Sequence, residues 1–358
     1  MSRKRTSTDV TIFDVAEEAG VSYSTVSRVV NNKAYVKPTT REKVLKAMDR
    51  LGYRANIQAR SLAGGHSSVI GLLVVDLATQ YVGELVRGID EVLAANKYEL
   101  MLYTTHRRVT KEADYVNMMA RGFADGLIIV LPRKPEAYLM SLRERQFPYV
   151  LLDQFGVDDS DLSVIAENFR GAYKATQHLI QLGHQRIGMI TGWMDMASAR
   201  QRLDGYHAAL NDHGILPDPQ LIYEGNFTQL CGRQGADYLL ELSSPPTAFF
   251  ASNDDSAVGV MEAARARGLI VPADLSVVGF DDIPLAKVLS PRLTTVKQPL
   301  TEMGNVAAQL LLDLIQDPDE VQQSIVLPTE LVIRESTARL ACDGIVRDDI
   351  TWEIENGF

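Results

Sequence analysis

The sequence lacks the features that mark secreted, membrane-bound and zinc-binding proteins. Its 358 residues include two cysteines, Cys231 and Cys342, which lie far apart and form no metal-type spacing. A disulfide framework and a zinc site are therefore not expected. No apolar run approaches the ~20 residues that span a bilayer, and no apolar stretch follows the basic N-terminus as it does in a secretory signal. We expect a cytoplasmic protein that makes no membrane contact.

Motifs of the common enzyme classes are also missing. The chain has no Gly-rich phosphate loop, no G-x-S-x-G elbow and no H-E-x-x-H, and its six histidines are scattered. We therefore expect a protein that is not an enzyme and carries no cofactor or metal. A sugar-processing enzyme is the alternative, which turnover of a bound sugar would favour.

The charge of the chain is unevenly distributed. Its net charge is −10, yet residues 1–66 hold 12 Lys and Arg against 6 Asp and Glu, and the other 292 residues hold 24 against 40. A small basic segment on a large acidic body is typical of a nucleic-acid-binding module joined to a domain of another kind. The alternative is an accidental cluster of solvated charge, so the residue pattern has to decide.

The basic segment is predicted to form three short helices. Ile12 begins an apolar stripe at i, i+3, i+4 and i+7, and Thr11 caps this first helix. Ser22 caps a second helix that has valines on one side and hydrogen-bonding side chains on the other. Pro38 opens a third helix, with a capping box completed by Glu42.

Two helices joined by a tight turn, the second with a polar outer face, form a helix-turn-helix whose second helix reads base edges in the major groove of DNA. Tyr23, Ser24 and Arg28 face outward on this helix, and arginine is the commonest partner of guanine. Shorter polar side chains are expected to hold phosphates. The expected DNA contacts of this head are Thr11, Ser22, Tyr23, Ser24, Thr25, Ser27, Arg28 and Asn31.

Residues 56–67 are predicted to form a conditional hinge helix that also contacts DNA. Asn56 can cap it, and Ala59 and Leu62 share one face. An isolated helix of under ~12 residues is marginal in water, so this one should order only when a twin helix and DNA pack against it. Leu62 would then be a wedge between base steps in the minor groove. The alternative is a linker whose Leu62 only touches the next domain.

The rest of the chain alternates apolar strand candidates with amphipathic helices, a pattern typical of parallel sheets with helices on both faces. The predicted strands are 68–76, 98–104, 124–131, 148–153, 186–192, 221–226, 247–253 and 275–282. Roughly 270 residues exceed one comfortable core, so we expect two lobes. Ligands of open α/β sheets bind beyond the carboxyl ends of the strands, which predicts a site in the cleft between the lobes.

Polar residues stand at the ends of several predicted strands. They are Asp76, Asp153, Asn253 and Asp281. Arg200, just after the fifth strand, is the cation best placed to meet them. Arginine and carboxylate groups suit the vicinal hydroxyls of a sugar, and aromatic rings cover its apolar face. A strand-end Asp can instead cap the following helix, and Asp254 is a candidate for such a cap.

The segments TIFDVAEEAGVSYSTVSRVVNN and LGYRANIQARSLAGG, together with the body, resemble the LacI/GalR family of bacterial transcription regulators over residues 11–338. The resemblance implies that Tyr23, Ser24 and Arg28 contact bases and that Leu62 inserts at the operator centre. It implies a homodimer on a pseudo-palindromic DNA operator. It also implies a two-lobed periplasmic-binding-protein-like body, in which the chain crosses between lobes near Ala166, Thr294 and Val326.

The resemblance also implies an effector site, with Arg200 holding the ligand. Many relatives have proline where this chain has Trp193, which either stacks on a sugar or fills the gap. Tyr81 and Phe227 can be ligand-covering or core aromatics. The expected effector-binding residues are Arg200, Asp281, Asn253, Phe227, Tyr81, Asp153 and Trp193.

We therefore predict an α/β protein with a three-helix head, and a sequence-specific repressor controlled by a small-molecule effector. A mono- or disaccharide is the expected effector, and a purine or other metabolite acting as co-repressor is the alternative. An extracellular sugar-binding protein of the same body fold would need a signal peptide and would lack the basic head. The expected segments are a DNA-binding domain (1–55), a hinge (56–67), an effector-binding and dimerisation domain (68–340) and a tail (341–358). The tail has no leucine heptad, so a dimer is expected rather than a tetramer.

Overall fold

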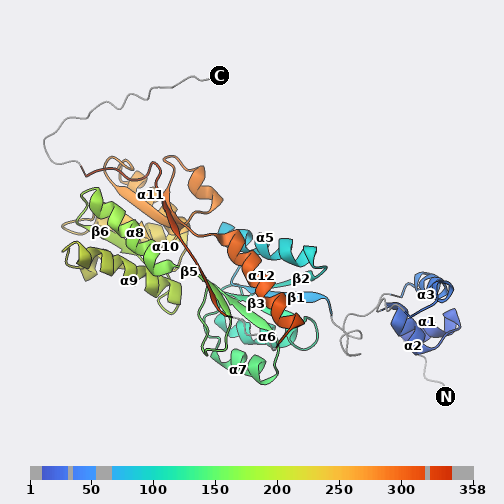
Figure 1. Cartoon of the computed structure of the whole chain (residues 1–358). Coiled ribbons are helices and arrows are strands. Elements are labelled where there is room, and N and C mark those ends of the chain that lie inside the picture. Colours follow the sequence, from blue (N-terminus) through green and yellow to red (C-terminus); the bar gives the residue numbers. More distant parts are fainter. Residues whose placement is uncertain (1–9, 31–34, 54–66, 319–322, 341–358) are drawn as a thin grey trace, which may run out of the picture. The chain divides into compact units, whose positions relative to one another are not determined.

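The structure of the protein is a computed structural model that describes residues 10–30, 35–53, 67–318 and 323–340. Four predicted DNA contacts lie outside the described residues, as does the tail after residue 340; these contacts are Asn31, Asn56, Ala59 and Leu62. Figure 1 labels the helices and strands.

The head consists of α1 (Ile12–Ala19), α2 (Tyr23–Val30) and α3 (Pro38–Leu51), as the apolar spacing predicted. Their inner faces meet in one small core. Its buried members are Val15, Ala16, Val26, Val29, Val44 and Ala47. Gly20 ends α1 with a left-handed backbone (φ 63°), which allows the tight turn into α2.

Two of the three helix caps predicted for the head are confirmed. The backbone N–H of Thr11 donates to the Asp14 carboxylate over 2.7 Å, and the N–H of Asp14 donates back to the Thr11 hydroxyl over 3.4 Å. Ser22 accepts from the N–H of Thr25 over 3.3 Å. The capping box predicted for α3 is wrong, because Lys37 is its N-cap and makes no side-chain bond. Glu42 instead pairs with Lys46 one turn later, over 2.8 Å.

In the described part of the body, the strands form two six-stranded sheets. Sheet A contains, in spatial order, β11 (Ile325–Leu327), β5 (Ser163–Ala166), β4 (Tyr149–Leu152), β3 (Gly126–Val130), β1 (Val69–Val74) and β2 (Glu99–Thr104). Sheet B contains β12 (Glu330–Val332), β10 (Thr294–Lys297), β9 (Ser276–Asp281), β8 (Ala248–Ala251), β6 (Ile187–Ile190) and β7 (Ile222–Tyr223). The strand β10 pairs antiparallel with β12, and the pairs β1–β2, β1–β3, β4–β5, β5–β11, β6–β7, β6–β8, β8–β9 and β9–β10 are parallel.

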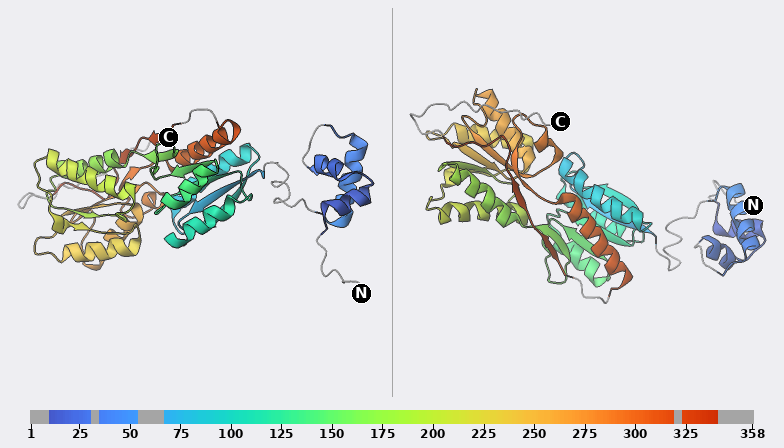
Figure 2. Two further views of the ribbon diagram at one scale, coloured as in Figure 1. Left: turned by 90° about the horizontal axis from the view of Figure 1, so that it is seen from below. Right: turned by 45° about the horizontal axis from the view of Figure 1, so that its top comes forward.

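Sheet B is covered by helices on both faces, as the alternating pattern predicted (Figures 1 and 2). Side chains of β8 alternate: Phe250 packs with α8 (Asn168–Gln181) and α9 (Ala197–Asp212), whereas Phe249 packs with α10 (Gln229–Leu240) and α11 (Asp254–Ala266). Because successive side chains of a strand point to opposite faces, a strand buried on both sides reads as one apolar run. This explains why β8 and β9 were recognisable from the sequence.

The remaining elements complete the two compact units of the chain. They are α5 (Gln80–Ala95), α6 (Glu112–Met119), α7 (Glu136–Glu144), α12 (Leu300–Gln316) and the 3₁₀ turns Val109–Lys111, Pro219–Leu221 and Pro284–Lys287. One unit holds the described residues of Met1–Val75, Asp90–Val150 and Ala308–Gln322, and the other holds those of Asp76–Ile89, Leu151–Ala307 and Gln323–Phe358. The chain changes sheet after β5, again between β10 and β11, and again between β11 and β12. None of the described helices has both the length and the apolar character needed to cross a membrane.

Candidate functional site

The exposed face of α2 carries the polar side chains that were predicted to meet DNA. Ser22, Tyr23, Ser24 and Arg28 are exposed, and Thr25 and Ser27 are half-buried. The Ser22 hydroxyl lies 2.8 Å from that of Ser24 and 2.9 Å from that of Thr25, so these hydroxyls form a small network at the start of the helix. Thr11 is exposed too, but its hydroxyl and its N–H both donate to Asp14.

In the second unit, a buried arginine lies among the residues at the strand ends. Arg202, on α9, is 2% exposed. Its Nε donates to the Asn168 side-chain oxygen over 2.8 Å, and its Nη1 donates to the carbonyl of Ser252 and lies 3.6 Å from the Asp281 carboxylate. The guanidinium also stacks 3.8 Å from the centre of the Phe280 ring, an arrangement that favours a buried cation.

The expectation that Arg200 occupies this place is corrected by the structure. Arg200 is exposed, and its Nη1 donates to the carbonyl of Met194 over 2.8 Å. Residues two apart on a helix point in nearly opposite directions, so Arg200 and Arg202 cannot both face the sheet. Arg202 lies on the buried stripe of α9 with Ala199 and Tyr206. This helical phase was present in the sequence and would have identified Arg202.

Three buried carboxylates form a cluster at Arg202, and each is 4% exposed or less. Asp153 and Asp281 interact with the Arg202 guanidinium, and Asp254 lies next to Asp281. Burial raises the pKa of all three above its usual value, because a low-dielectric environment disfavours the charged form. For Asp281 burial raises the pKa to about 7, although Arg202 and a hydrogen bond from Gln298 oppose the rise. The nearby charge of Asp281 raises the pKa of Asp254 further.

Buried acceptor oxygens in this cluster have no hydrogen-bond partner among the described residues. Tyr81 donates to Asp153 Oδ2 over 2.7 Å, which leaves Asp153 Oδ1 unpartnered. The side-chain Nε2 of Gln298 donates to Asp281 over 2.7 Å, whereas its Oε1 has no partner. The Ser252 hydroxyl has no partner either. A buried polar atom without a partner costs about 1–3 kcal/mol. These atoms therefore indicate where a bound molecule would supply donors.

Aromatic side chains lie beside the cluster. The centre of the Phe227 ring lies 5.8 Å from the Arg202 guanidinium and 6.3 Å from the centre of the Trp193 ring, with the two ring planes at 74°. A Cβ on Gly192 would stand 1.9 Å from the Phe227 ring, so only glycine leaves room for this ring. Tyr81 is buried, and its hydroxyl donates to Asp153.

The other strand-end residues are engaged within the protein. The side chain of Asn253 caps α11 by accepting from Ser256 N–H over 3.0 Å, and it donates to the carbonyl of Phe227 over 3.1 Å. Asp254 does not cap α11; it accepts from the Thr295 hydroxyl over 2.5 Å and from Ile283 N–H over 2.9 Å. Asp76 accepts from the N–H of Ala78 over 3.0 Å, and because Ala78 precedes α5 this bond closes a turn and does not cap the helix.

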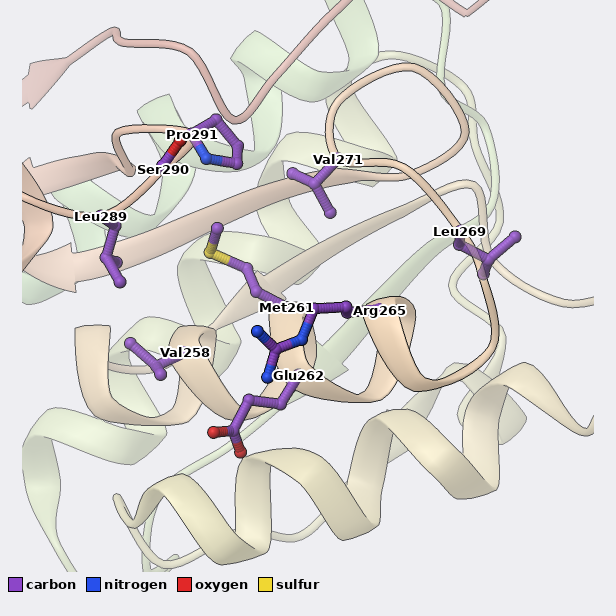
Figure 3. A pocket seen from close by; sticks show the side chains of 9 residues that line it. All are labelled: Val258, Met261, Glu262, Arg265, Leu269, Val271, Leu289, Ser290 and Pro291. Carbon is purple, nitrogen blue, oxygen red and sulfur yellow. The ribbon is translucent and has the colours of Figure 1, made fainter.

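An apolar groove of about 320 Å³ lies on the same unit, along α11 and the loops beside it (Figure 3). Its walls are mainly aliphatic, and Glu262 and Arg265 are its charged members. The complete lining is Val258, Met261, Glu262, Arg265, Leu269, Val271, Leu289, Ser290 and Pro291. Val288, next to Leu289, is 77% exposed. None of the predicted effector residues lines this groove.

Comparisons with known proteins agree with this arrangement. Residues 11–56 match the bacterial regulatory proteins of the lacI family, and residues 176–337 match a periplasmic binding protein-like domain. Catabolite control protein A of Priestia megaterium is 37% identical over 331 residues, which cover 92% of this chain and 99% of the relative. The HTH-type transcriptional repressor PurR of Vibrio atlanticus is 36% identical over 332 residues, with the same coverage of both chains.

The chain belongs to the lacI family. Among solved structures, the lac repressor dimer bound to operator and the anti-inducer ONPF is 35% identical with a TM-score of 0.79, covering 92% of this chain and 100% of that chain. A complex of the transcriptional regulator CelR with cellobiose is 32% identical with a TM-score of 0.72 and the same coverage. The lacI-family chain is thus a DNA-binding transcription regulator and not an enzyme.

Proposed function

We propose that this regulator is a homodimeric repressor whose operator affinity is controlled by a neutral, hydroxyl-rich small molecule, most simply a mono- or disaccharide. Arg202, Asp153 and Asp281 would hold this effector, with Tyr81, Phe227 and Trp193 around it. Asn253 would position Phe227 through the bond to its carbonyl. The observation that carries the proposal is the set of unpartnered buried acceptors, Asp153 Oδ1 and Gln298 Oε1.

Unpartnered acceptors favour a ligand that brings several hydrogen-bond donors. A sugar hydroxyl donates to a carboxylate or amide oxygen and can accept from a guanidinium at the same time. Relatives fit this class, since CelR was solved with cellobiose and an Enterococcus faecium lacI-family regulator with ribose. Because some relatives are named PurR, a purine is the alternative effector.

An anionic ligand is disfavoured by the charges of the cluster. The Arg202 guanidinium already lies 3.6 Å from the Asp281 carboxylate, and its charge also acts on Asp153. A phosphate placed there would add negative charge next to buried carboxylates, which is unfavourable in a low-dielectric site. We therefore propose free sugars rather than sugar phosphates as effectors.

On DNA, we propose that Ser22, Tyr23, Ser24, Thr25, Ser27, Arg28 and Thr11 contact a pseudo-palindromic operator, with Asn31, Asn56, Ala59 and Leu62 completing the interface. The segments proposed for this are a DNA-binding domain (1–55) and a hinge (56–67), followed by the effector and dimerisation domain (68–340) and a tail (341–358). Because operator DNA lies in the bacterial cytoplasm, the regulator is proposed to act there. The effector changes operator affinity only by binding one conformation of the regulator better than another.

The test is a thermal-shift panel of mono- and disaccharides, their phosphates and purine bases. A ligand at about 100 times its Kd adds about 2.7 kcal/mol to the stability, so a specific sugar should give a clear shift and its phosphate none. Asp153→Asn is the matched variant, since it keeps the shape and replaces a carboxylate oxygen with an amide group. We expect this variant to lose the shift and Arg200→Ala to keep it. A shift with a purine alone, or one that Asp153→Asn leaves intact, would overturn the proposed effector site.

A further inference from the structure

The head exposes a large aromatic side chain beside its DNA-reading helix. Phe13, on α1, is 66% exposed and takes no part in the core of the head. Its ring lies 5.0 Å from that of Tyr23, with the planes only 19° apart, so the two rings are stacked. Tyr23 is the first residue of α2 and is itself 43% exposed. The pair therefore forms an exposed apolar surface at the start of α2, where Ser22 and Ser24 flank Tyr23 in the sequence.

Stacking on Tyr23 does not account for the exposure of Phe13. Most of its apolar surface remains in contact with water, which is unfavourable at about 25 cal/mol per Å². Its backbone lies in the first turn of α1, which the Thr11–Asp14 capping box stabilises. Two adjacent exposed aromatic rings form a contiguous apolar patch, which is the kind of surface that a partner covers.

The chemistry of phenylalanine narrows what that partner can offer. The ring has no hydrogen-bonding group, so it can neither hold a phosphate nor read a base edge by hydrogen bonds. In the major groove, the apolar group on a base edge is the C5 methyl of thymine, and phenylalanine is one of the side chains that contact it. The first residues of a recognition helix contact base edges, and successive bases are about 3.4 Å apart along a strand. A ring 5.0 Å from Tyr23 is therefore within reach of the same or the adjacent base pair.

We infer that Phe13 is a specificity-determining residue that covers the methyl group of a thymine in each operator half-site. The inference rests on the proposed operator binding by α2 and adds a residue of α1 to the base-reading surface. It predicts a selectivity for thymine over its methyl-free analogue that the hydrogen-bonding residues of α2 cannot provide.

The experiment uses the full-length protein and an operator selected from a random duplex library. Each thymine of the selected site is replaced singly by deoxyuridine, which removes the methyl and keeps base pairing. Dissociation constants are then measured for the wild type, Phe13→Ala, Phe13→Leu and the control Leu45→Ala, whose side chain is 51% exposed on α3. Circular dichroism confirms that each head is folded.

We expect one thymine per half-site at which deoxyuridine weakens wild-type binding about fourfold, the worth of one buried methyl group. Phe13→Ala should bind thymine and deoxyuridine equally there, Phe13→Leu should keep part of the difference, and Leu45→Ala should keep all of it. If Phe13 only supports Tyr23, Phe13→Ala will weaken binding but keep the full deoxyuridine penalty, and the inference is wrong. A site in which no thymine shows a penalty also overturns it. Failure to select any sequence would contradict operator binding itself, a distinct result.

Discussion

Replacing Arg202 with leucine tests whether this guanidinium neutralises the buried carboxylates. The substitution removes the 2.8 Å hydrogen bond to Asn168, the bond to the carbonyl of Ser252 and the 3.6 Å ion pair with Asp281. It also removes the cation stacked on Phe280. Breaking a buried ion pair by removing one partner costs about 3–5 kcal/mol. We expect a loss of this order in the free energy of unfolding at neutral and alkaline pH.

The loss should grow with pH. In the wild type, burial raises the pKa of Asp281 from its usual value of 3.8 to about 7, while Arg202 opposes the rise. The native state then binds this proton more tightly than the unfolded state, so this group lowers stability as pH rises towards 7 and has no further effect above it. Without Arg202 the pKa of Asp281 rises further. The variant should therefore keep losing stability above pH 7, by up to about tenfold in the unfolding equilibrium constant per pH unit.

The assay is urea unfolding followed by circular dichroism at about pH 6 and pH 8.5, in wild type, Arg202→Leu and the matched control Arg200→Ala. Arg200 is exposed, so its removal should change the unfolding free energy by no more than about 0.5 kcal/mol at either pH. The penalty of Arg202→Leu should be clearly larger at the higher pH. An equal penalty at both pH values, or a penalty for Arg200→Ala of similar size, would refute this account of the cluster.

Three further predictions concern other parts of the body. Burial lowers the pKa of His184, whose ring contacts Thr247, Ser276 and the carbonyl of Ala338. The stability that this residue contributes is therefore lost as pH falls below about 6.5. The urea midpoint should drop more in wild type than in His184→Gln between about pH 7.5 and 5.5. Gly192→Ala should cost about 1–3 kcal/mol by displacing the Phe227 ring, and should weaken sugar binding in calorimetry. If the groove beside Val288 is buried in the dimer, Val288→Glu should raise the dimer dissociation constant at least about tenfold in sedimentation, whereas Leu216→Glu, at an 89% exposed position, should not.

Much of the fold was predictable because its signals are local. The three helices of the head follow from apolar spacing and from the caps at Thr11 and Ser22. Most strand candidates follow from runs that are apolar on both faces, as in β1 and β3, although the candidate 221–226 forms only the two-residue strand β7. The strands β5, β10, β11 and β12 were not found, since their sequences hold at most three consecutive apolar residues, whereas the equally short β4, β6 and β8 lie within longer apolar runs. Runs that short carry no periodicity to recognise.

The candidate site was predictable in part for the same reason. Asp153, Asn253 and Asp281 were found because they stand at the ends of long apolar runs in the sequence. Asn168 and Gln298 were missed because they follow β5 and β10, which were not recognised as strands. Arg202 was missed for a different reason. Arg200 is nearer in sequence to the end of β6, but the direction of an arginine on α9 depends on its position around the helix. That position turns Arg202 to the sheet and Arg200 to solvent.

Burial of charge alone does not identify a ligand-binding residue in this cluster. Asp254 is as buried as Asp153 and Asp281, and its pKa is raised well above its usual value. Both of its oxygens are nevertheless hydrogen-bonded, one to the Thr295 hydroxyl and the other to Ile283 N–H. Asp254 therefore ties β10 and the loop after β9 to the start of α11, a structural role complete without a ligand. Asp153 differs because one oxygen accepts from Tyr81 and the other has no partner among the described residues. The desolvation cost of that oxygen is recovered only when a donor reaches it. It follows that the unpartnered oxygen of Asp153, rather than its buried charge alone, is the feature that favours a ligand contact in the proposed effector site.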